Sequence, residues 1–319
     1  MRGKMCCTGC CGASPVPSPT CSPMFCPTRR PCCVTRENFM NSPSVSLSGF
    51  RQSNTCEIRQ LKSDLEMAEL TLEGPGIIYV TSKIVCTDVL DDKTYLKWYE
   101  EDHIPDILEK TPINSAFRFS NVKPDAERPY LLVYPMENLA DIHGEGFKQL
   151  RLYSDFMPNK GAPYDFADLD FREYKLIQKY DPRGTAGEKV KFIATGGFEL
   201  GLSLKEEHLH DWYNQEHLER LSTVPGYLRT TRYRLMHHST NEDTRVMFGL
   251  TSKDDLVIQE RDEPPTWHAI HEFDENFDMN ALRETIDTEW TKKIFSDTTK
   301  QEYNVYRHEK SYGDGEFFR

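Results

Sequence analysis

Between residues 76 and 309, short runs of β-branched and aromatic residues alternate with longer segments whose apolar residues recur at helical spacing. The short runs are typical of strands, and the longer segments are typical of helices that bury one face. The expected strands are 76–85, 114–120, 128–135 and 171–180, followed by 189–198, 227–235, 266–273 and 301–309. The expected helices lie around 98 and 212, and over 146–155 and 279–295. The order strand–helix–strand–strand–helix–strand occurs twice, which predicts two ferredoxin-like βαββαβ units.

The two halves also match residue by residue. The segment "WYEEDHIPDIL" begins at residue 98 and "WYNQEHLERL" begins at residue 212, and 98–119 aligns with 212–233 without a gap. The identical pairs are Trp98 and Trp212, Tyr99 and Tyr213, His103 and His217, and Arg118 and Arg232. A match of this density indicates an internal duplication. Because one such unit covers only one face of its sheet with helices, we expect the open faces to pair. The predicted fold is therefore α+β, a single-chain, pseudo-dimeric α+β barrel.

Residues 1–66 differ in composition from the rest of the chain. Eight of the ten cysteines lie within residues 1–33, among many prolines and serines and without a hydrophobic period. This composition predicts a disordered extension, and Met67 would also serve as a start just ahead of the first strand, which would place the extension outside the native protein. A metal site or palmitoylation of the cysteines has weaker support, because the spacing is not that of zinc ligands. The predicted boundaries are 1–66 for the extension, 67–181 for the first repeat and 182–319 for the second repeat.

Charge and composition exclude several classes of function. The net charge is −12 and 38% of the residues are hydrophobic, which fits a globular protein without a basic face for nucleic acid. No run approaches the roughly 18 apolar residues of a membrane helix. Cys56 and Cys86 are the cysteines beyond residue 33, as expected of a reduced, cytoplasmic protein. We expect a small-molecule ligand, no nucleic-acid or membrane partner, and either a monomer or a weak homodimer.

The sequence contains no phosphate-binding glycine motif, nucleophile elbow or H-E-x-x-H zinc motif. A haem would fit a barrel of this type, but no histidine has an obviously suitable setting. We therefore predict no cofactor and no metal.

Each repeated histidine falls on the apolar face of its helix, four residues after a tyrosine. His103 with Tyr99, and His217 with Tyr213, could therefore be core residues whose hydrogen bonds are satisfied. They could equally border a pocket between helix and sheet and act as general acid or base near neutral pH. Trp98 and Trp212 are expected at the edge of the same face.

The repeated arginines lie on strands and are expected to point away from the side chain that follows each of them. Arg118 or Arg232 could bind a carboxylate or enolate oxygen in a pocket. Alternatively, each could pair with Asp102 or Glu216 on the neighbouring helix.

Local signals add further expectations. Ser203 with Glu206 has the spacing of a capping box, and Asp91 or Asp92 can cap the first helix. The long link from 238 to 265 contains "RVMFGL", which is compatible with an additional strand. Pro105 is expected to kink the first helix and to open space around His103, whereas the second helix should be regular and His217 packed shut. This favours His103 as the reactive group, oriented by Tyr99 and assisted by Arg118.

The two Trp-Tyr…His segments, together with "ERPYLLVYPMENL", "PPTWHAIHEFD" and "TEWTKKI", resemble the EthD-like branch of the dimeric α+β barrel superfamily, in particular its two-repeat fungal proteins. The resemblance covers about residues 67–312. It implies an α+β barrel and, by analogy with other branches, cofactor-free decarboxylase, cyclase, isomerase or oxygenase chemistry on small aromatic or polyketide-like molecules. By position it implies His103 with Tyr99 and His217 with Tyr213 for proton transfer.

Three functions remain open from the sequence. The protein could be a cofactor-independent lyase or cyclase acting on a small aromatic or polyketide-like acid. It could instead be a non-catalytic small-molecule-binding protein, or an accessory scaffold with a filled core. A cavity lined by histidine and other polar groups would favour the enzyme, an apolar cavity the binding protein, and a filled core the scaffold.

Overall fold

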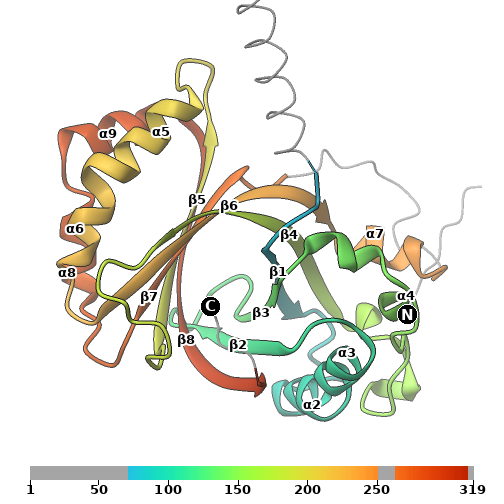
Figure 1. Ribbon diagram of the computed structural model, residues 1–319. Helices are drawn as coiled ribbons and strands as arrows, with labels where there is room; N and C mark the ends of the chain where they lie inside the picture. The colour runs from blue at the N-terminus through green and yellow to red at the C-terminus, as the bar shows by residue number, and fades with distance from the viewer. Residues whose placement is uncertain (1–70, 251–262, 315–319) are drawn as a thin grey trace, which may run out of the picture. The chain divides into compact units, whose positions relative to one another are not determined.

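The computed structural model describes residues 71–250 and 263–314 (Figure 1). The cysteine-rich segment lies outside these residues, so the prediction that it is disordered stays a prediction. Cys86 lies within them and is a free cysteine. Among the described residues, no helix is long and apolar enough to cross a membrane.

The described residues form a closed antiparallel barrel (Figure 1). Its strands in the first repeat are β1 (Gly76–Ile84), β2 (Ser115–Asn121), β3 (Tyr130–Met136) and β4 (Ala167–Tyr180). Those in the second repeat are β5 (Phe192–Leu200), β6 (Tyr227–Ser239), β7 (Trp267–Phe273) and β8 (Thr298–Gly313). The order around the barrel is β1-β3-β2-β8-β5-β7-β6-β4. Each repeat thus has its first and third strands in the centre and its second and fourth at the edges, as in a ferredoxin-like unit. The predicted single-chain α+β barrel of two βαββαβ repeats is confirmed.

Two pairings between the repeats close the barrel. Strand β2 pairs with β8, and β4 pairs with β6. Each pairing joins the second strand of one repeat to the fourth strand of the other, so the two junctions correspond to each other by the repeat symmetry. An unpaired sheet edge would expose backbone groups and invite association with other chains. Closure pairs every strand that the structure describes on both of its sides.

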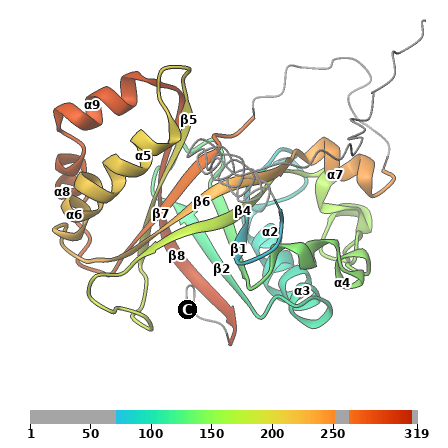
Figure 2. The ribbon, with the colours of Figure 1, turned by 45° about the horizontal axis from the view of Figure 1, so that its top comes forward.

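The barrel interior is filled by one apolar cluster to which all of these strands contribute. Its fully buried members are Ile77, Tyr79, Phe117, Phe119, Leu131, Val133, Tyr174, Ile193, Tyr233, Ile270 and Tyr306. Side chains on a strand point alternately to the two faces, so the intervening residues face outward against the helices. The helices of the two repeats lie on opposite sides of the barrel, except for α7 (Asn241–Met247) of the second repeat, which lies on the side of the first-repeat helices (Figures 1 and 2). Each helical layer forms a separate apolar cluster with the outer face of its own sheet.

The first helix of each repeat begins differently. Helix α2 (Asp92–Trp98) is capped by Asp91, whose side chain accepts a hydrogen bond from the Thr94 N–H at 2.7 Å. This confirms Asp91 as the cap. Helix α5 (Glu206–Trp212) begins after Lys205 without a side-chain cap. The capping box predicted from Ser203 is wrong, because the helix begins too late for Ser203 to reach its first turn.

The second crossover also differs between the repeats. In the first repeat the predicted helix shrinks to α4 (Glu145–Lys148), and the chain then continues to β4 through short 3₁₀ turns. In the second repeat it is divided into α8 (Met279–Thr285) and α9 (Glu289–Ser296). The strand expected in "RVMFGL" is wrong, since its first three residues end α7 (Asn241–Met247) and a turn follows. A capping box between Thr240 and Asp243 starts this helix, and local capping therefore prevails over the β-like composition.

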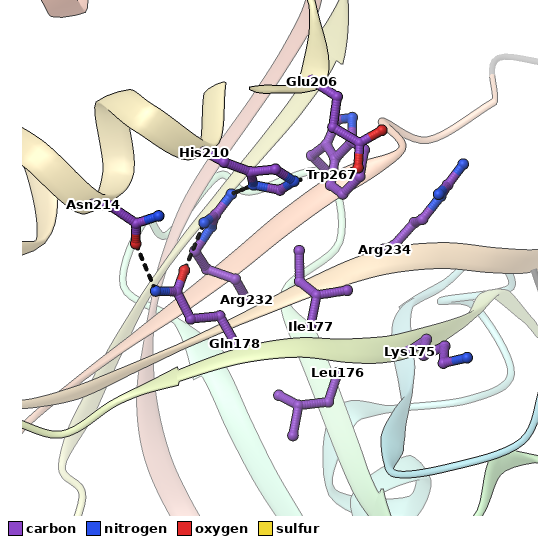
Figure 3. A pocket seen from close by; sticks show the side chains of 10 residues that line it. All are labelled: Lys175, Leu176, Ile177, Gln178, Glu206, His210, Asn214, Arg232, Arg234 and Trp267. Atoms are coloured by element: carbon purple, nitrogen blue, oxygen red, sulfur yellow. Dashed lines mark hydrogen bonds and ion pairs between the residues drawn. The ribbon is translucent and has the colours of Figure 1, made fainter. Parts of the chain in front are cut away.

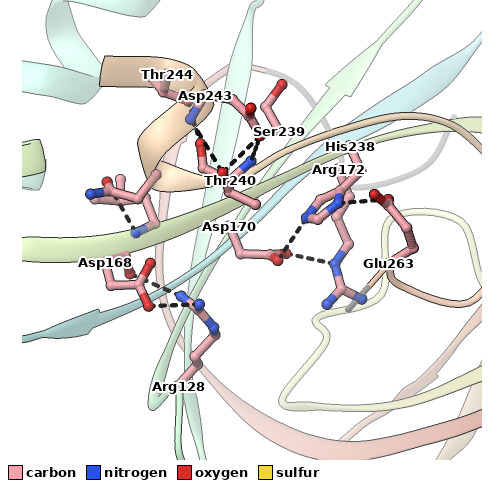
Figure 4. Close-up of polar contacts among 12 residues, drawn as sticks. Arg128, Asp168, Asp170, Arg172, His238, Ser239, Thr240, Asp243, Thr244 and Glu263 are labelled. Atoms are coloured by element: carbon pink, nitrogen blue, oxygen red, sulfur yellow. Dashed lines mark hydrogen bonds and ion pairs between the residues drawn. The ribbon is translucent and has the colours of Figure 1, made fainter. Parts of the chain in front are cut away.

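Polar contacts fasten the end of β6 to β4 (Figure 4). The His238 ring lies 3.0 Å from both Asp170 and Glu263. Burial alone lowers the pKa of His238, but hydrogen bonds and charge attraction from Asp170 and Glu263 outweigh it, and the pKa is raised. Next to it, the Arg172 guanidinium pairs with Asp170 and with Glu302 of β8, each at 2.6 Å. The contacts of Arg172 therefore link strands from both repeats at this end of the barrel.

Separating the repeats should expose the surfaces that closure covers. We expect residues 67–181 and residues 182–319, expressed alone, to dimerise or aggregate, because the interior face and two strand edges of each lose their partners. Size-exclusion chromatography with light scattering would show this. A stable monomer of either half would contradict the prediction.

Candidate functional site

Both Trp-Tyr…His segments form a helix that is interrupted by a wider turn. Helix α2 leads into a π-helical turn (Tyr99–His103) and then into α3 (Ile104–Lys110). Helix α5 leads in the same way into a π-helical turn (Tyr213–His217) and then into α6 (Leu218–Ser222). In each turn, a backbone N–H bonds to the carbonyl five residues earlier. Such π-helical turns within α-helices are frequent at functional sites.

The π-helical turn brings each tryptophan onto its histidine. The Trp98 and His103 rings stack with centroids 4.7 Å apart, and the Trp212 and His217 rings with centroids 4.3 Å apart. These residues are five positions apart, and regular α-helical spacing would separate them by about 140° around the axis. The tryptophans, predicted at the edge of the apolar face, therefore cover one face of the imidazoles instead.

Pro105 does not distinguish the two helices as the sequence suggested. The second repeat has Glu219 at the corresponding position, yet it makes the same π-helical turn. Pro105 follows directly after the π-helical turn, and the backbone stays helical on both sides of it. The prediction of a kinked first helix and a regular second helix is wrong.

Around His103, the space beneath the helix is filled. The Tyr95 hydroxyl donates to the Tyr99 hydroxyl at 3.2 Å, and Ser82 lies 3.5 Å from the same oxygen. The irregular segment between β3 and β4 packs several large side chains against this helix and sheet, namely Leu139, Ile142, Phe147, Leu150, Phe156, Met157 and Tyr164. The carboxylate of Asp102 pairs with Arg151 at 2.7 Å. His103 is half-buried, and desolvation lowers its pKa to about 4, although Asp106 and Asp102 oppose this effect.

Around His217, by contrast, there is a cavity of about 320 Å³. It lies between the outer face of the second-repeat sheet and helices α5, α6, α8 and α9. The rings of Tyr213, His217, His271 and Tyr303 border it, together with apolar side chains such as Phe198 and Leu282. The expectation that His217 is packed shut is wrong. His103, which the sequence favoured because of Pro105, lies in the more densely filled repeat.

Two small residues on β5 explain why the cavity is in the second repeat. Strand pairing places Ala194 opposite His271 and Gly196 opposite Ala269. At the equivalent places in the first repeat, Ile78 lies opposite Tyr134 and Val80 opposite Leu132. These larger side chains face the helix and belong to its apolar cluster. Removing their volume from the sheet face leaves room beneath the second helix.

The cavity brings together two histidines from different elements. The rings of His217 and His271 meet edge to face, with centroids 5.8 Å apart. Nδ1 of His271 lies 2.9 Å from the Thr230 hydroxyl, which lies 2.9 Å from the Tyr227 hydroxyl. This chain of hydroxyl groups orients His271. Nδ1 of His217 is buried and has no hydrogen-bond partner among the described residues.

Both imidazoles are held in the neutral form. Desolvation lowers the pKa of His271 to about 3, and the nearby Arg232 adds to this effect. Desolvation also lowers the pKa of His217 well below its usual value, and His271 and Arg232 lower it further. A neutral imidazole can accept a proton or donate one N–H hydrogen bond. At neutral pH each ring is therefore present as an uncharged acceptor or N–H donor.

The two repeated arginines have different surroundings. Arg118 pairs with Glu100 at 2.8 Å, and not with Asp102 as one alternative supposed. Arg232 is 3% exposed and stacks over the Tyr213 ring at 3.8 Å. It borders a second pocket, of about 540 Å³, on the other side of α5 (Figure 3). Glu216, the other alternative partner, accepts a hydrogen bond from Thr288 instead.

The sequence singled out one histidine of the pair and missed the other. His271 lies in the strand segment "TWHAIHEF", in which strand alternation places it on the same face as Trp267 and Ala269. That alternation was the available signal, but the register between β7 and the helix was needed to bring His271 to His217. Among the described residues, no group of three histidine, cysteine or acidic side chains could hold a metal.

Comparison with known proteins does not assign the chain to a family. The chain matches no family model. Core atranone cluster (CAC) protein 1 of Stachybotrys chlorohalonatus (strain IBT 40285) is 23% identical over 203 residues, which is 63% of this chain and 82% of that protein. The chain has the dimeric α+β barrel fold. The resemblance to the EthD-like branch stays a prediction.

Solved structures with a similar course of the chain are more distant. An anthrone oxidase-like protein has a TM-score of 0.47 at 13% identity, covering 78% of this chain and 96% of that chain. Chlorite dismutase from Candidatus Nitrospira defluvii has a TM-score of 0.41 at 11% identity, covering 77% and 95%. At these values the likenesses say nothing about the chemistry of this chain.

Burial of neutral His217 should make stability depend on pH. Its folded pKa lies well below the unfolded value of about 6.5. As pH falls below 6.5, the unfolded chain takes up a proton that the folded chain does not, so the free energy of unfolding decreases. His217→Leu should reduce this slope by up to about 1.4 kcal/mol per pH unit.

Urea unfolding at several values between pH 7 and pH 5 would measure the slope. His208→Leu is the matched control, because His208 is exposed on α5 in the same repeat. An unchanged slope in His217→Leu would contradict the assignment of a buried, neutral imidazole.

Proposed function

We propose that the protein acts on a small, ring-containing compound in the second-repeat cavity. There, His217 removes a proton from an acidic C–H of that compound without a cofactor. The observation that carries the proposal is the pair of neutral histidines from helix and sheet, whose rings contact each other and border this cavity. The substrate class is an aromatic or polyketide-like acid or ketone.

The cavity supports a small and largely apolar ligand. Its volume of about 320 Å³ is at the lower end of small-molecule sites and suits a compound of about one or two rings. Trp212, Phe198 and Phe295 offer aromatic surface, while Tyr213, His271 and Asn304 offer polar groups. Apolar walls with a few polar groups are typical of such sites.

The proposed step moves one proton. The C–H bond of the substrate breaks, its electron pair moves onto the adjacent carbonyl oxygen, and the imidazole of His217 takes the proton. The resulting enolate is stabilised by a hydrogen bond from the N–H of His271, whose ring Thr230 orients. Return of the proton to the same or another carbon completes an exchange or an isomerisation. His217 is the proposed base because its ring borders the cavity and is uncharged.

The relative from Stachybotrys chlorohalonatus supports a role in small-molecule metabolism. Its name assigns it to the core atranone cluster. At 23% identity, the relative does not identify the substrate. Binding without catalysis is the second candidate function, and the apolar share of the cavity wall favours it.

The repeated tyrosines and tryptophans have supporting roles in this proposal. Tyr213 borders the cavity directly, and Trp212 fixes the His217 ring by stacking. In the first repeat, Tyr99, Trp98 and His103 repeat the same contacts around a filled space. We propose that they mainly stabilise the first repeat, and that Arg118 does so through its pair with Glu100.

Deuterium uptake from heavy water into aromatic ketones and acids, followed by NMR, would detect the proton transfer. We expect the wild-type protein to accelerate exchange for a member of such a panel. His217→Gln should reduce the rate by about 10²- to 10⁴-fold, as for loss of a general base. His103→Gln is the matched control from the other repeat and should leave the rate unchanged.

Filling the cavity tests binding separately from catalysis. Gly196→Val restores the residue type of the first repeat, and a Cβ at Gly196 would make ordinary contacts of 3.6 Å with Phe198. This variant should fold and lose ligand binding, measured by calorimetry with the compound that exchanges. If His217→Gln exchanges at the wild-type rate, the base is assigned wrongly. If the wild-type protein binds compounds but exchanges none, the binding function is the correct one.

A further inference from the structure

The pocket beside Arg232 lies apart from the histidine cavity. Its wall is formed by the β4–β6 junction, by α5 and by Trp267 of β7 (Figure 3). The Tyr213 ring borders the histidine cavity, and the Arg232 guanidinium, which borders this pocket, stacks on that ring. Tyr213 and Arg232 therefore belong to the partition between the two spaces.

Arg232 is a buried cation whose hydrogen bonds go to uncharged acceptors. One of its N–H groups donates to Gln178 at 2.6 Å, and another donates to Nδ1 of His210 at 2.7 Å. Because Nδ1 of His210 accepts this bond, the His210 ring is neutral and can donate from Nε2 to Glu206 at 3.2 Å. A guanidinium has five N–H donors, and these two bonds leave others for a ligand.

The first repeat has an ionic contact at the equivalent position. There, Glu100 pairs with Arg118 at 2.8 Å and with Lys310 at 2.7 Å. The residues at the places of Glu100 and Lys310 in the second repeat are Asn214 and Gln178, which bond to each other at 2.8 Å. The second repeat thus has a contact between neutral amides where the first has an ionic contact, and both repeats have the arginine.

The electrostatic consequence is an uncompensated positive charge. Desolvation lowers the pKa of Arg232 to about 10, and the attraction of Tyr213 and Glu206 offsets this only in part. Arg234 and Lys175 also border the pocket, and Glu206 is the one acidic side chain among the described residues that line it. In a chain of net charge −12, this pocket is locally cationic. A buried charge without a partner costs stability unless a ligand supplies one.

We infer that this pocket binds the carboxylate of a small aromatic acid. The planar guanidinium of Arg232 matches a carboxylate in geometry and charge. Trp267 and Ile177 border the same pocket and offer surface for a ring. The anion would take the place that Glu100 occupies beside Arg118 in the first repeat. Nothing in this inference depends on proton transfer by His217.

Titration calorimetry with benzoate at low chloride concentration tests the inference. Asn214→Glu rebuilds the carboxylate of the first repeat beside Arg232 and should weaken benzoate binding about tenfold or more. Gln215→Glu is the matched control, since it adds the same charge at an exposed neighbouring position of the same turn. It should keep the wild-type affinity. Benzamide, which has the same ring but no charge, should not bind.

Further variants locate the site. Arg232→Gln should also lose benzoate, and it replaces Asn214→Glu if the latter fails to fold. Gly196→Val fills the histidine cavity and should leave benzoate affinity unchanged. The inference is overturned if the wild-type protein does not bind benzoate, or if either folded pocket variant binds it with wild-type affinity. Equal affinity for benzamide, binding of phosphate but not benzoate, or loss of benzoate in Gly196→Val would also overturn it.

Discussion

The structure depends on covering the inner apolar face of two four-stranded sheets. The helices of each repeat pack on the outer face of its sheet. The strand side chains that point to the inner face are therefore not buried within the repeat alone. The interior cluster, from Ile77 of β1 to Tyr306 of β8, takes side chains from every strand of both repeats. Burial of such side chains contributes about 1.5 to 3 kcal/mol each. This requirement brings the halves together, and the β2–β8 and β4–β6 pairings satisfy the edges that would otherwise remain open.

The buried interior and the paired strand edges hold the barrel together, so the outer layers of the two repeats are free to differ. The first repeat fills its outer layer with Ile78 and Val80 below the helix and with the irregular segment before β4. The second repeat has Ala194 and Gly196 at the equivalent places, and a cavity results. The ionic contact of Glu100 with Arg118 likewise has a neutral counterpart at Asn214 beside Arg232. One repeat thus resembles a stabilising copy, and the other has the features of a binding site.

The low-polarity surroundings in the second repeat also determine the charge states of its buried side chains. They keep His217 and His271 neutral because charging either would cost desolvation energy. They also leave the Arg232 charge without full compensation across the Tyr213 ring. Neutral imidazoles line one space, and a buried cation borders the next. They make the second repeat the place to look for ligands.

The sequence by itself determined the order of strands and helices along the chain, the duplication and the barrel. Strand alternation and the gapless match of 98–119 with 212–233 can both be read directly from the residues. The sequence also placed His103 and His217 on the faces of their helices that pack against the sheet. Its choice between them rested on Pro105, and that argument was wrong, since both helices make the same π-helical turn.

Only the tertiary structure decided which repeat has room and which side chains meet. His271 reaches His217 through the register of β7 against β5 and the packing of a helix on both, and the β4–β6 junction brings Gln178 to Arg232. The cavity depends on whether Ala194 and Gly196 or Ile78 and Val80 lie beneath the helix. The free volume and the net charge at such a contact depend on side chains from several elements that are distant in sequence. They therefore cannot be predicted from any one segment.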